Sequence, residues 1–468
     1  MDDSTKSHTP GVIVAMRRLT LASAALIVVA APLAFHPAVE RGFVLPKLLA
    51  LQTFTTMGLA AALAAWLATG APLPGVRLPR GLAVLLLGWL LWTGSAYLTA
   101  FDRARSWTGS TEWVNGLQTR LFLFGMAWLV FSATLHSGAP ARLQRALVWT
   151  SIPVVAYGLA QAAGYDPIDW FHTTFVFSTL GNANRLAGYL VMAAPFTIAL
   201  IAGTSGRIAR LAGVGLLSAQ ILTLAATRSR AGLAALAVTL IVLAVFRRAR
   251  QPRRPLRWVV AGAITTLLVT FAVGSSGDSI FALAGGAEPR PAVWLSALNA
   301  ILARPITGWG PGSFDLTLGA HASAVFREYL ASTGSLWDRT HNIWLEWAVE
   351  TGLPGLALSA LLLWSVVRTA VAALENAPGQ RRWLPAAGAA ALVGYFMQQL
   401  LNTSSIGLTV LAWWIAAFTV GISAADSREP WPHLARLSAR QRVVAGVLAL
   451  SLVGAIGVPA IIDTLRQL

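Results

Sequence analysis

One histidine has the surroundings expected of a general base. His341 lies in the polar run Asp338–Asn342 and is followed by Glu346 and Glu350, which are four residues apart and so share one face of a predicted helix. An imidazole with an unperturbed pKa of about 6.5 can accept a proton from a hydroxyl group at neutral pH. The same position also suits an interfacial histidine or a helix cap. The residues therefore favour either a base that activates a hydroxyl group or a structural histidine.

A first arginine lies directly before a predicted short amphipathic helix, Pro291–Leu302. Arg290 precedes this helix and Trp294 follows one turn later. A guanidinium group can hold a phosphate with two parallel hydrogen bonds, which makes Arg290 a candidate phosphate ligand. The alternative is a structural salt bridge with Glu288.

Further arginines lie at the ends of predicted membrane spans. Arg228 and Arg230 are two residues apart in a very short connection, where two cations are costly unless they face water or an anion. Their alternative is to extend towards lipid headgroups. Arg185 follows the asparagines of Gly181–Asn184, a pattern typical of a helix N-terminus, and adds a cation to the same face. We predict that these arginines together bind an anion.

Other kinds of site find little support. The glycine-rich segment Gly308–Phe314 predicts tight turns, but it has neither the lysine nor the strand–loop–helix setting of a nucleotide-binding loop. The chain has no cysteine, which excludes thiolate chemistry. The best metal candidate is the trio Asp166, Asp169 and His172, but no convincing metal motif occurs. We therefore predict neither a metal nor a cofactor.

The composition predicts the scaffold that must position these residues. Of the 468 residues, 56% are hydrophobic and only 11% are charged, against about 25% charged in soluble domains. Such a chain is an all-α polytopic membrane protein of about 12–13 transmembrane helices. Thirteen spans are predicted, roughly at 19–35, 43–69, 81–100, 117–134, 146–163, 186–203, 211–227, 231–246, 257–274, 342–367, 384–401, 406–424 and 443–461.

The loop charges predict the topology. With a cytoplasmic N-terminus and an uncleaved first span, the cytoplasmic loops hold 22 of the 35 basic residues but five of the 18 acidic ones. This positive-inside pattern accounts for the net charge of +17 without nucleic-acid binding. We predict one membrane unit, with spans in 1–274 and 342–468 and an outer loop at 275–341. All the polar clusters above then face outwards, where a reaction must use a donor that is already activated.

Four segments resemble one known family when they are taken in order. They are GNANRLAGYL from Gly181, TRSRAGLAAL from Thr227, RPAVWLSALNAILARPITGWGPGSF from Arg290 and DRTHNIWLEWAVETGLPG from Asp338. Together they resemble the O-antigen ligase / O-antigen polymerase superfamily over about residues 175–405. These are bacterial inner-membrane glycosyltransferases that take glycans from undecaprenyl diphosphate.

The resemblance implies a metal-independent enzyme of the membrane GT-C type with a periplasmic active site. His341 would be the general base, and Arg290, with Arg228 or Arg230 and more loosely Arg185, would hold the diphosphate. Supporting residues would be Asn342, Asp338, Trp294 and Glu350. Outer tryptophans such as Trp113 and Trp337 could stack on sugars or belong to the interfacial aromatic belt.

Three functions follow from this pattern. The first is a ligase that joins a glycan from undecaprenyl diphosphate to a lipid A–core hydroxyl in one inverting step. The second is a polymerase whose acceptor is another lipid-linked glycan. The third is a transporter or flippase of a lipid-linked anion, which would use the arginines without His341.

Overall fold

The computed structural model describes residues 9–69, 78–110, 112–170, 175–248, 290–334, 337–376, 379–424 and 438–468, and it has no strand in these ranges. The all-α prediction is confirmed. The helices are α1 (Thr9–Leu33), α2 (Leu45–Thr69), α3 (Arg80–Leu98), α4 (Arg103–Thr108), α5 (Leu117–Thr134), α6 (Ala139–Ala162), η2 (Ser178–Leu180), α7 (Ala183–Gly203), α8 (Arg207–Ala226), α9 (Arg230–Arg248), α11 (Arg290–Ala303), α12 (Phe314–His321), α13 (Ala324–Thr333), α14 (Ile343–Asn376), η4 (Gly379–Arg382), α15 (Trp383–Gln398), α16 (Ile406–Ala424) and α17 (Ala439–Gln467).

Twelve of the thirteen predicted spans coincide with a helix. Ten helices in the described part of the chain are long and apolar enough to cross a membrane, namely α1, α2, α3, α5, α7, α8, α9, α14, α16 and α17. The predicted spans at 146–163 and 384–401 correspond to α6 and to the 16-residue α15. The span predicted at 257–274 lies outside the described residues. The chain is thus a multi-pass membrane protein, whereas its division at 274 and 341 stays a prediction.

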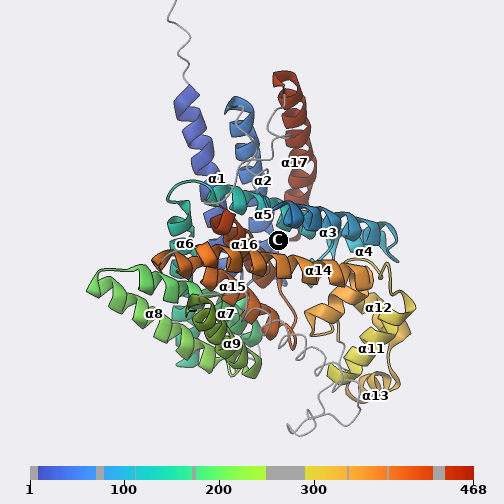
Figure 1. Cartoon of the computed structure of the whole chain (residues 1–468). Coiled ribbons are helices and arrows are strands. Elements are labelled where there is room, and N and C mark those ends of the chain that lie inside the picture. The colour runs from blue at the N-terminus through green and yellow to red at the C-terminus, as the bar shows by residue number, and fades with distance from the viewer. Residues whose placement is uncertain are drawn as a thin grey trace, which may run out of the picture.

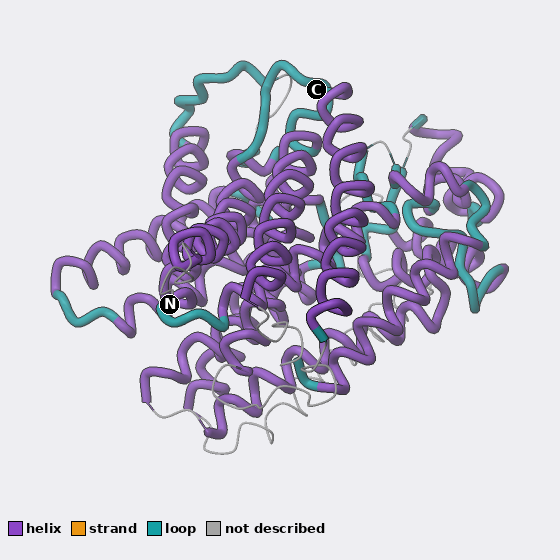
Figure 2. The backbone as a smooth tube through the Cα atoms, turned by 90° about the horizontal axis from the view of Figure 1, so that it is seen from above, coloured by secondary structure: helices purple, strands orange, loops and turns teal. Residues whose placement is uncertain are grey.

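Small residues bring the central helices together. α15 packs against α7, α9 and α16, and α16 also packs against α5 and α1. Gly388 and Gly394 of α15 lie directly against Thr419 of α16 and Thr239 of α9, so a larger side chain would not fit there. Such small residues let helices approach closely within a membrane, where apolar burial alone drives no association. Figure 2 shows this crowded central bundle from above.

The last helix runs beside α2 over its whole length. Thr464 donates to Gln52 at 2.8 Å, and Gly457 lies against Thr56. At the end of α17, Arg41 donates to Gln467 at 3.0 Å. Figure 1 shows α1, α2 and α17 standing together. These contacts show that α17 runs antiparallel to α2, and both helices are long and apolar enough to cross a membrane.

A second, smaller core lies on one side of the molecule. α11, α12 and α13 pack against the beginning of α14 around Trp294, Phe314, Phe326 and Val349. Figure 1 shows these short helices together with α4 on the right, at the end where α14 begins. The short helix predicted at Pro291–Leu302 is confirmed as α11. This small core anchors the loop that carries His341.

Candidate active site

His341 occupies an unusual backbone position. Its φ is +51°, in the left-handed region that costs a non-glycine residue on the order of 1 kcal/mol. Its Nδ1 lies 3.3 Å from the carbonyl oxygen of Arg339. A carbonyl can only accept, so Nδ1 carries the proton and Nε2 is the atom left to accept one. The Trp337 ring packs against the imidazole, with ring centroids 4.5 Å apart.

The surroundings keep this imidazole neutral. Burial lowers the pKa of His341 to about 4, and the charges of Arg290 and Arg339 act in the same direction, against opposing effects of its backbone hydrogen bond and Asp338. His341 therefore holds an unprotonated Nε2 at neutral pH. The effect of Arg290 on this pKa also shows that Arg290, at the beginning of α11, lies close to His341.

Backbone contacts hold the His341 loop from three sides. The indole of Trp294 donates to the carbonyl of Thr340 at 2.8 Å. The Asn342 side chain accepts hydrogen bonds from the backbone amides of Trp344 and Leu345, so it caps α14. The amide of Ile343 donates to the carbonyl of Gln399 at 3.1 Å. Trp294 and Asn342, predicted as supporting residues, thus fix the backbone around His341.

A buried ion cluster lies beside this loop. Glu346 and Glu350, on one face of α14 as predicted, both lie near the guanidinium of Arg339, and Glu350 also pairs with Arg120 of α5. The Glu350 side chain is 1% exposed and further accepts from Asn115 at 2.7 Å. Sequence reasoning missed Arg120. An isolated arginine inside an otherwise apolar predicted span was the available signal.

The glycine-rich segment Gly308–Phe314 packs against α14 where that helix is broken. Gly352 has φ +69° and interrupts α14, which leaves carbonyl groups at the end of its first part without helical partners. The amides of Trp309 and Gly310 donate to the carbonyls of Val349 and Glu350, both at 2.9 Å. A Cβ on Gly308 would stand 2.6 Å from the Glu350 backbone, so only glycine fits. The segments that begin at Arg290 and Asp338 therefore fold against each other.

A tryptophan, Trp113, links Arg185 to the His341 loop. The guanidinium of Arg185 lies 4.8 Å from the centre of the Trp113 ring, and that of Arg339 lies at the same distance. The Trp113 indole donates to Asp338, whose charge also acts on Arg185. Trp113 and Asp338 thus connect the Arg185 helix to the candidate base, three residues along from Asp338.

A buried lysine lies next to Arg185. Lys47 of α2 donates through Nζ to the carbonyls of Pro32, Ala34 and Thr179, and it is close enough to Arg185 for the two charges to interact. Among the described residues, no acidic side chain forms an ion pair with either cation. Two adjacent cations held in this way favour an anion. Lys47 was not among the predicted site residues.

The Arg228–Arg230 turn joins the site through its central serine. Arg228 has φ +55°, and both arginines are exposed while Ser229 is buried. Ser229 donates to Asn184 at 2.7 Å, and Gln398 donates to the Asn184 carbonyl at 2.8 Å. The segments that begin at Gly181 and Thr227 therefore meet here. Within the described residues, neither guanidinium contacts the His341 loop directly, so their role as diphosphate ligands stays a prediction.

The metal candidate is only partly described. Asp166 accepts hydrogen bonds from Tyr157 and Gln161, at 2.9 and 2.6 Å. His172 and Glu288, the suggested partner of Arg290, lie outside the described residues. Within the described ranges, no group of three His, Cys, Asp or Glu side chains is placed to hold a metal ion.

Comparison with known proteins supports the resemblance. Residues 214–360 match the family model described as O-antigen ligase. The matched range contains Arg228, Arg230, Arg290 and His341, whereas Arg185 and Arg120 lie before it. No curated protein matches the chain. Residues 214–360 are thus similar to the O-antigen ligase family, in agreement with the resemblance to the O-antigen ligase/polymerase superfamily.

Proposed function

We propose, from the premise of an O-antigen ligase domain at residues 214–360, that this protein joins a preassembled glycan from undecaprenyl diphosphate to a hydroxyl group of lipid A–core. The observation that carries the proposal is the state of His341. Its Nδ1 donates to a carbonyl oxygen and its Nε2 can accept a proton, while the charges of Arg290 and Arg339 act on the imidazole. Arg185 lies against Trp113, whose indole donates to Asp338 of the same loop. This combination suits hydroxyl activation beside a polyanion. The site would lie at the periplasmic face of the bacterial inner membrane.

The proposed reaction is a single inverting displacement. Nε2 of His341 takes the proton from the acceptor hydroxyl as its oxygen attacks the anomeric carbon of the glycan. The bond from that carbon to the diphosphate oxygen breaks, and undecaprenyl diphosphate leaves with the electron pair. Arg290, with Arg185 and the Arg228–Arg230 turn, would stabilise the negative charge that develops on the leaving oxygen.

The diphosphate itself would improve the base. A negative charge within a few ångströms favours a protonated imidazole, so donor binding would raise the pKa of His341 from its low resting value. Proton acceptance would then become easier only when the donor is in place. The neutral resting state also avoids repulsion between an imidazolium ion and Arg290 before the donor arrives.

A polymerase of the same superfamily is the second candidate, since the domain match covers both kinds of enzyme. Purified protein would receive an undecaprenyl-diphosphate glycan together with either lipid A–core or a second lipid-linked glycan. Product on lipid A–core supports the ligase. Product on the lipid-linked glycan alone would contradict the ligase and support the polymerase. Transbilayer movement of the donor without transfer to either acceptor would contradict both and favour a flippase.

A further inference from the structure

An exposed apolar patch lies where α3 ends and where the α11–α12 connection meets the break in α14. Five large apolar side chains form this patch, and each is 50–76% exposed, namely Leu98, Phe101, Leu302, Ile306 and Leu353. Exposed apolar side chains gathered on one surface mark a contact with a membrane or with another protein. None of the five takes part in the candidate active site.

Backbone hydrogen bonds bring the segments of this patch together. The amide of Phe101 donates to the carbonyl of Trp309 at 3.3 Å. The amide of Leu353 donates to the carbonyl of Pro305, the residue before Ile306, at 2.8 Å. The patch is therefore one surface, which the α11–α12 connection shares with the end of α3 and with α14 just beyond its break.

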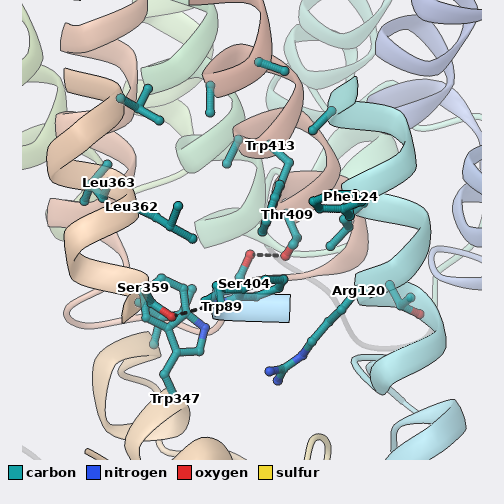
Figure 3. A pocket seen from close by; sticks show the side chains of 18 of the residues that line it. Trp89, Arg120, Phe124, Trp347, Ser359, Leu362, Leu363, Ser404, Thr409 and Trp413 are labelled. Carbon is teal, nitrogen blue, oxygen red and sulfur yellow. Dashed lines mark hydrogen bonds between the residues drawn. The ribbon is translucent and has the colours of Figure 1, made fainter. Parts of the chain in front are cut away.

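The patch continues the exposed faces of two membrane helices. α3 exposes a line of apolar side chains at helical spacing, namely Val84, Leu87, Leu91 and Leu98. Trp89 on the opposite face is buried and donates to Ser359 of α14 at 3.0 Å (Figure 3). On α14, every fourth residue from Leu353 through Ala357 to Leu361 is exposed. Because both helices are apolar enough to cross a membrane, acyl chains cover these faces up to the patch.

Figure 1 shows the same continuity at the level of whole helices. α3 and α14 run side by side, and α4, α11 and α12 lie at one shared end of the pair. No polar turn separates the exposed side chain of Leu98 from that of Phe101, since the two are only three residues apart. The lipid-facing surface therefore passes from the membrane helices onto the α11–α12 connection.

Two arginines and a tryptophan lie at the edge of the patch. Arg103 donates to the carbonyl of Leu98 at 3.2 Å, and Arg304 donates to that of Thr99 at 3.5 Å. The Arg304 guanidinium also lies 4.2 Å from the centre of the Trp309 ring. Within the described residues, neither arginine forms an ion pair with an acidic side chain. Cations and tryptophans beside an apolar surface are typical of the head-group level of a membrane, where lipid phosphates supply the negative charge.

We propose that this patch is inserted into the lipid bilayer where head groups meet acyl chains, with Arg103 and Arg304 at the level of the lipid phosphates. The α11–α12 connection is then held in the membrane, although it belongs to the segment predicted as an outer loop. Pro305 and Trp309 both contact α14 at its break, so this anchor also fixes the depth of the His341 loop. The inference requires a membrane protein but not the proposed reaction.

The test measures depth with a fluorescent label, because the chain has no native cysteine. Ile306→Cys would carry a nitrobenzoxadiazole group, whose emission shifts to the blue in an apolar environment. The labelled protein would be placed in nanodiscs of phosphatidylethanolamine and phosphatidylglycerol. Ala331→Cys, at an exposed position of α13, is the matched control. Each label would meet aqueous iodide and, separately, phospholipid that carries a spin label on its acyl chain.

We expect the Ile306→Cys label to emit at a shorter wavelength than the Ala331→Cys label. The acyl-chain spin label should quench the Ile306→Cys label at least about twofold more strongly than the control, whereas iodide should quench the control more strongly. A label at Arg103→Cys should respond more to a spin label on the lipid head group than to one on the acyl chain, because this position lies at the level of the phosphates.

Three results would overturn the inference. Equal quenching of the Ile306→Cys and Ala331→Cys labels by iodide would place the patch in water. Protection of the Ile306→Cys label from both iodide and the lipid spin labels would show that protein covers the patch, such as a second copy of this chain. A label at Arg103→Cys that responds to neither lipid spin label would remove the arginines from the lipid phosphates. Since none of these readouts uses transfer activity, the inference and the proposed function can fail separately.

Discussion

At the residue scale, the candidate base is defined by its backbone as much as by its side chain. His341 and Arg228 are two of the four described non-glycine residues with positive φ, and the sequence had singled out both. Backbone strain of this kind persists where surrounding contacts impose it and tends to occur at functional sites. The sequence predicted which residues to examine, but the tautomer of His341 and its low pKa depend on contacts from Arg339 and on burial.

The pH dependence of transfer should reveal this low pKa. Because the imidazole of the free enzyme is unprotonated above a pKa of about 4, kcat/KM for the donor should hold as the pH falls below 6 and decline only near 4. The acid limb of kcat should lie at higher pH, because the bound diphosphate raises the pKa. His321→Gln, at another histidine of the small core, should keep both profiles. An acid limb of kcat/KM at or above 6.5 would contradict the assignment.

Two substitutions of Arg228 separate the effect of backbone strain from the effect of the guanidinium charge. Glycine adopts positive φ without strain, so Arg228→Gly should be more stable than Arg228→Ala by about 1 kcal/mol, as measured by thermal unfolding. Both variants lose the guanidinium and should use the donor equally poorly. Equal stability of the two variants would show that the left-handed backbone is not strained, and normal donor kinetics would remove Arg228 from the diphosphate site.

At the scale of elements, the break in α14 organises the site. The hydropathy pattern predicted a span at 342–367, and the helix runs further, through Arg368 to Asn376, with its break at Gly352. Sequence spacing correctly placed Glu346 and Glu350 on one face. It could not show that Arg120 pairs with Glu350 across 230 positions, or that Trp113 donates to Asp338, because such contacts depend on how distant helices pack.

The glycine contact at this break predicts a stability effect. Gly308→Ala would place a methyl group against the Glu350 backbone at φ +67°, so it should destabilise the protein by about 2 kcal/mol or more and lower transfer. Gly319→Ala in α12, with open space around it, is the control and should leave stability unchanged or slightly raised. Thermal unfolding in detergent measures both. An unaffected Gly308→Ala protein would contradict the packing role of this segment.

At the scale of the whole molecule, hydropathy and charge predicted the membrane helices well, because each span must satisfy its own backbone within lipid. They could not predict the order in which the helices pack, such as α17 beside α2 or α15 between α9 and α16. Those neighbours follow from small residues such as Gly388, Gly394 and Gly457, whose partners are distant in sequence. The predicted orientation places the short helices α11–α13 outside the cytoplasm.

This orientation can be tested by labelling, since the chain has no native cysteine. Ala331→Cys on the exposed face of α13 should react with a membrane-impermeant maleimide in cells whose outer membrane alone is opened. Ser205→Cys, in the exposed connection between α7 and α8, should react only after the inner membrane is also opened. The reverse pattern would place the candidate site in the cytoplasm and contradict the proposed use of a periplasmic acceptor.

The most direct test of the account is single-turnover transfer by purified protein, with undecaprenyl-diphosphate glycan and lipid A–core, in the presence of a chelator. Wild type should transfer the glycan, and His341→Ala should lower the rate of transfer by about 100-fold or more while it still binds undecaprenyl diphosphate. Transfer by His341→Ala within twofold of the wild-type rate would show that His341 is not the base.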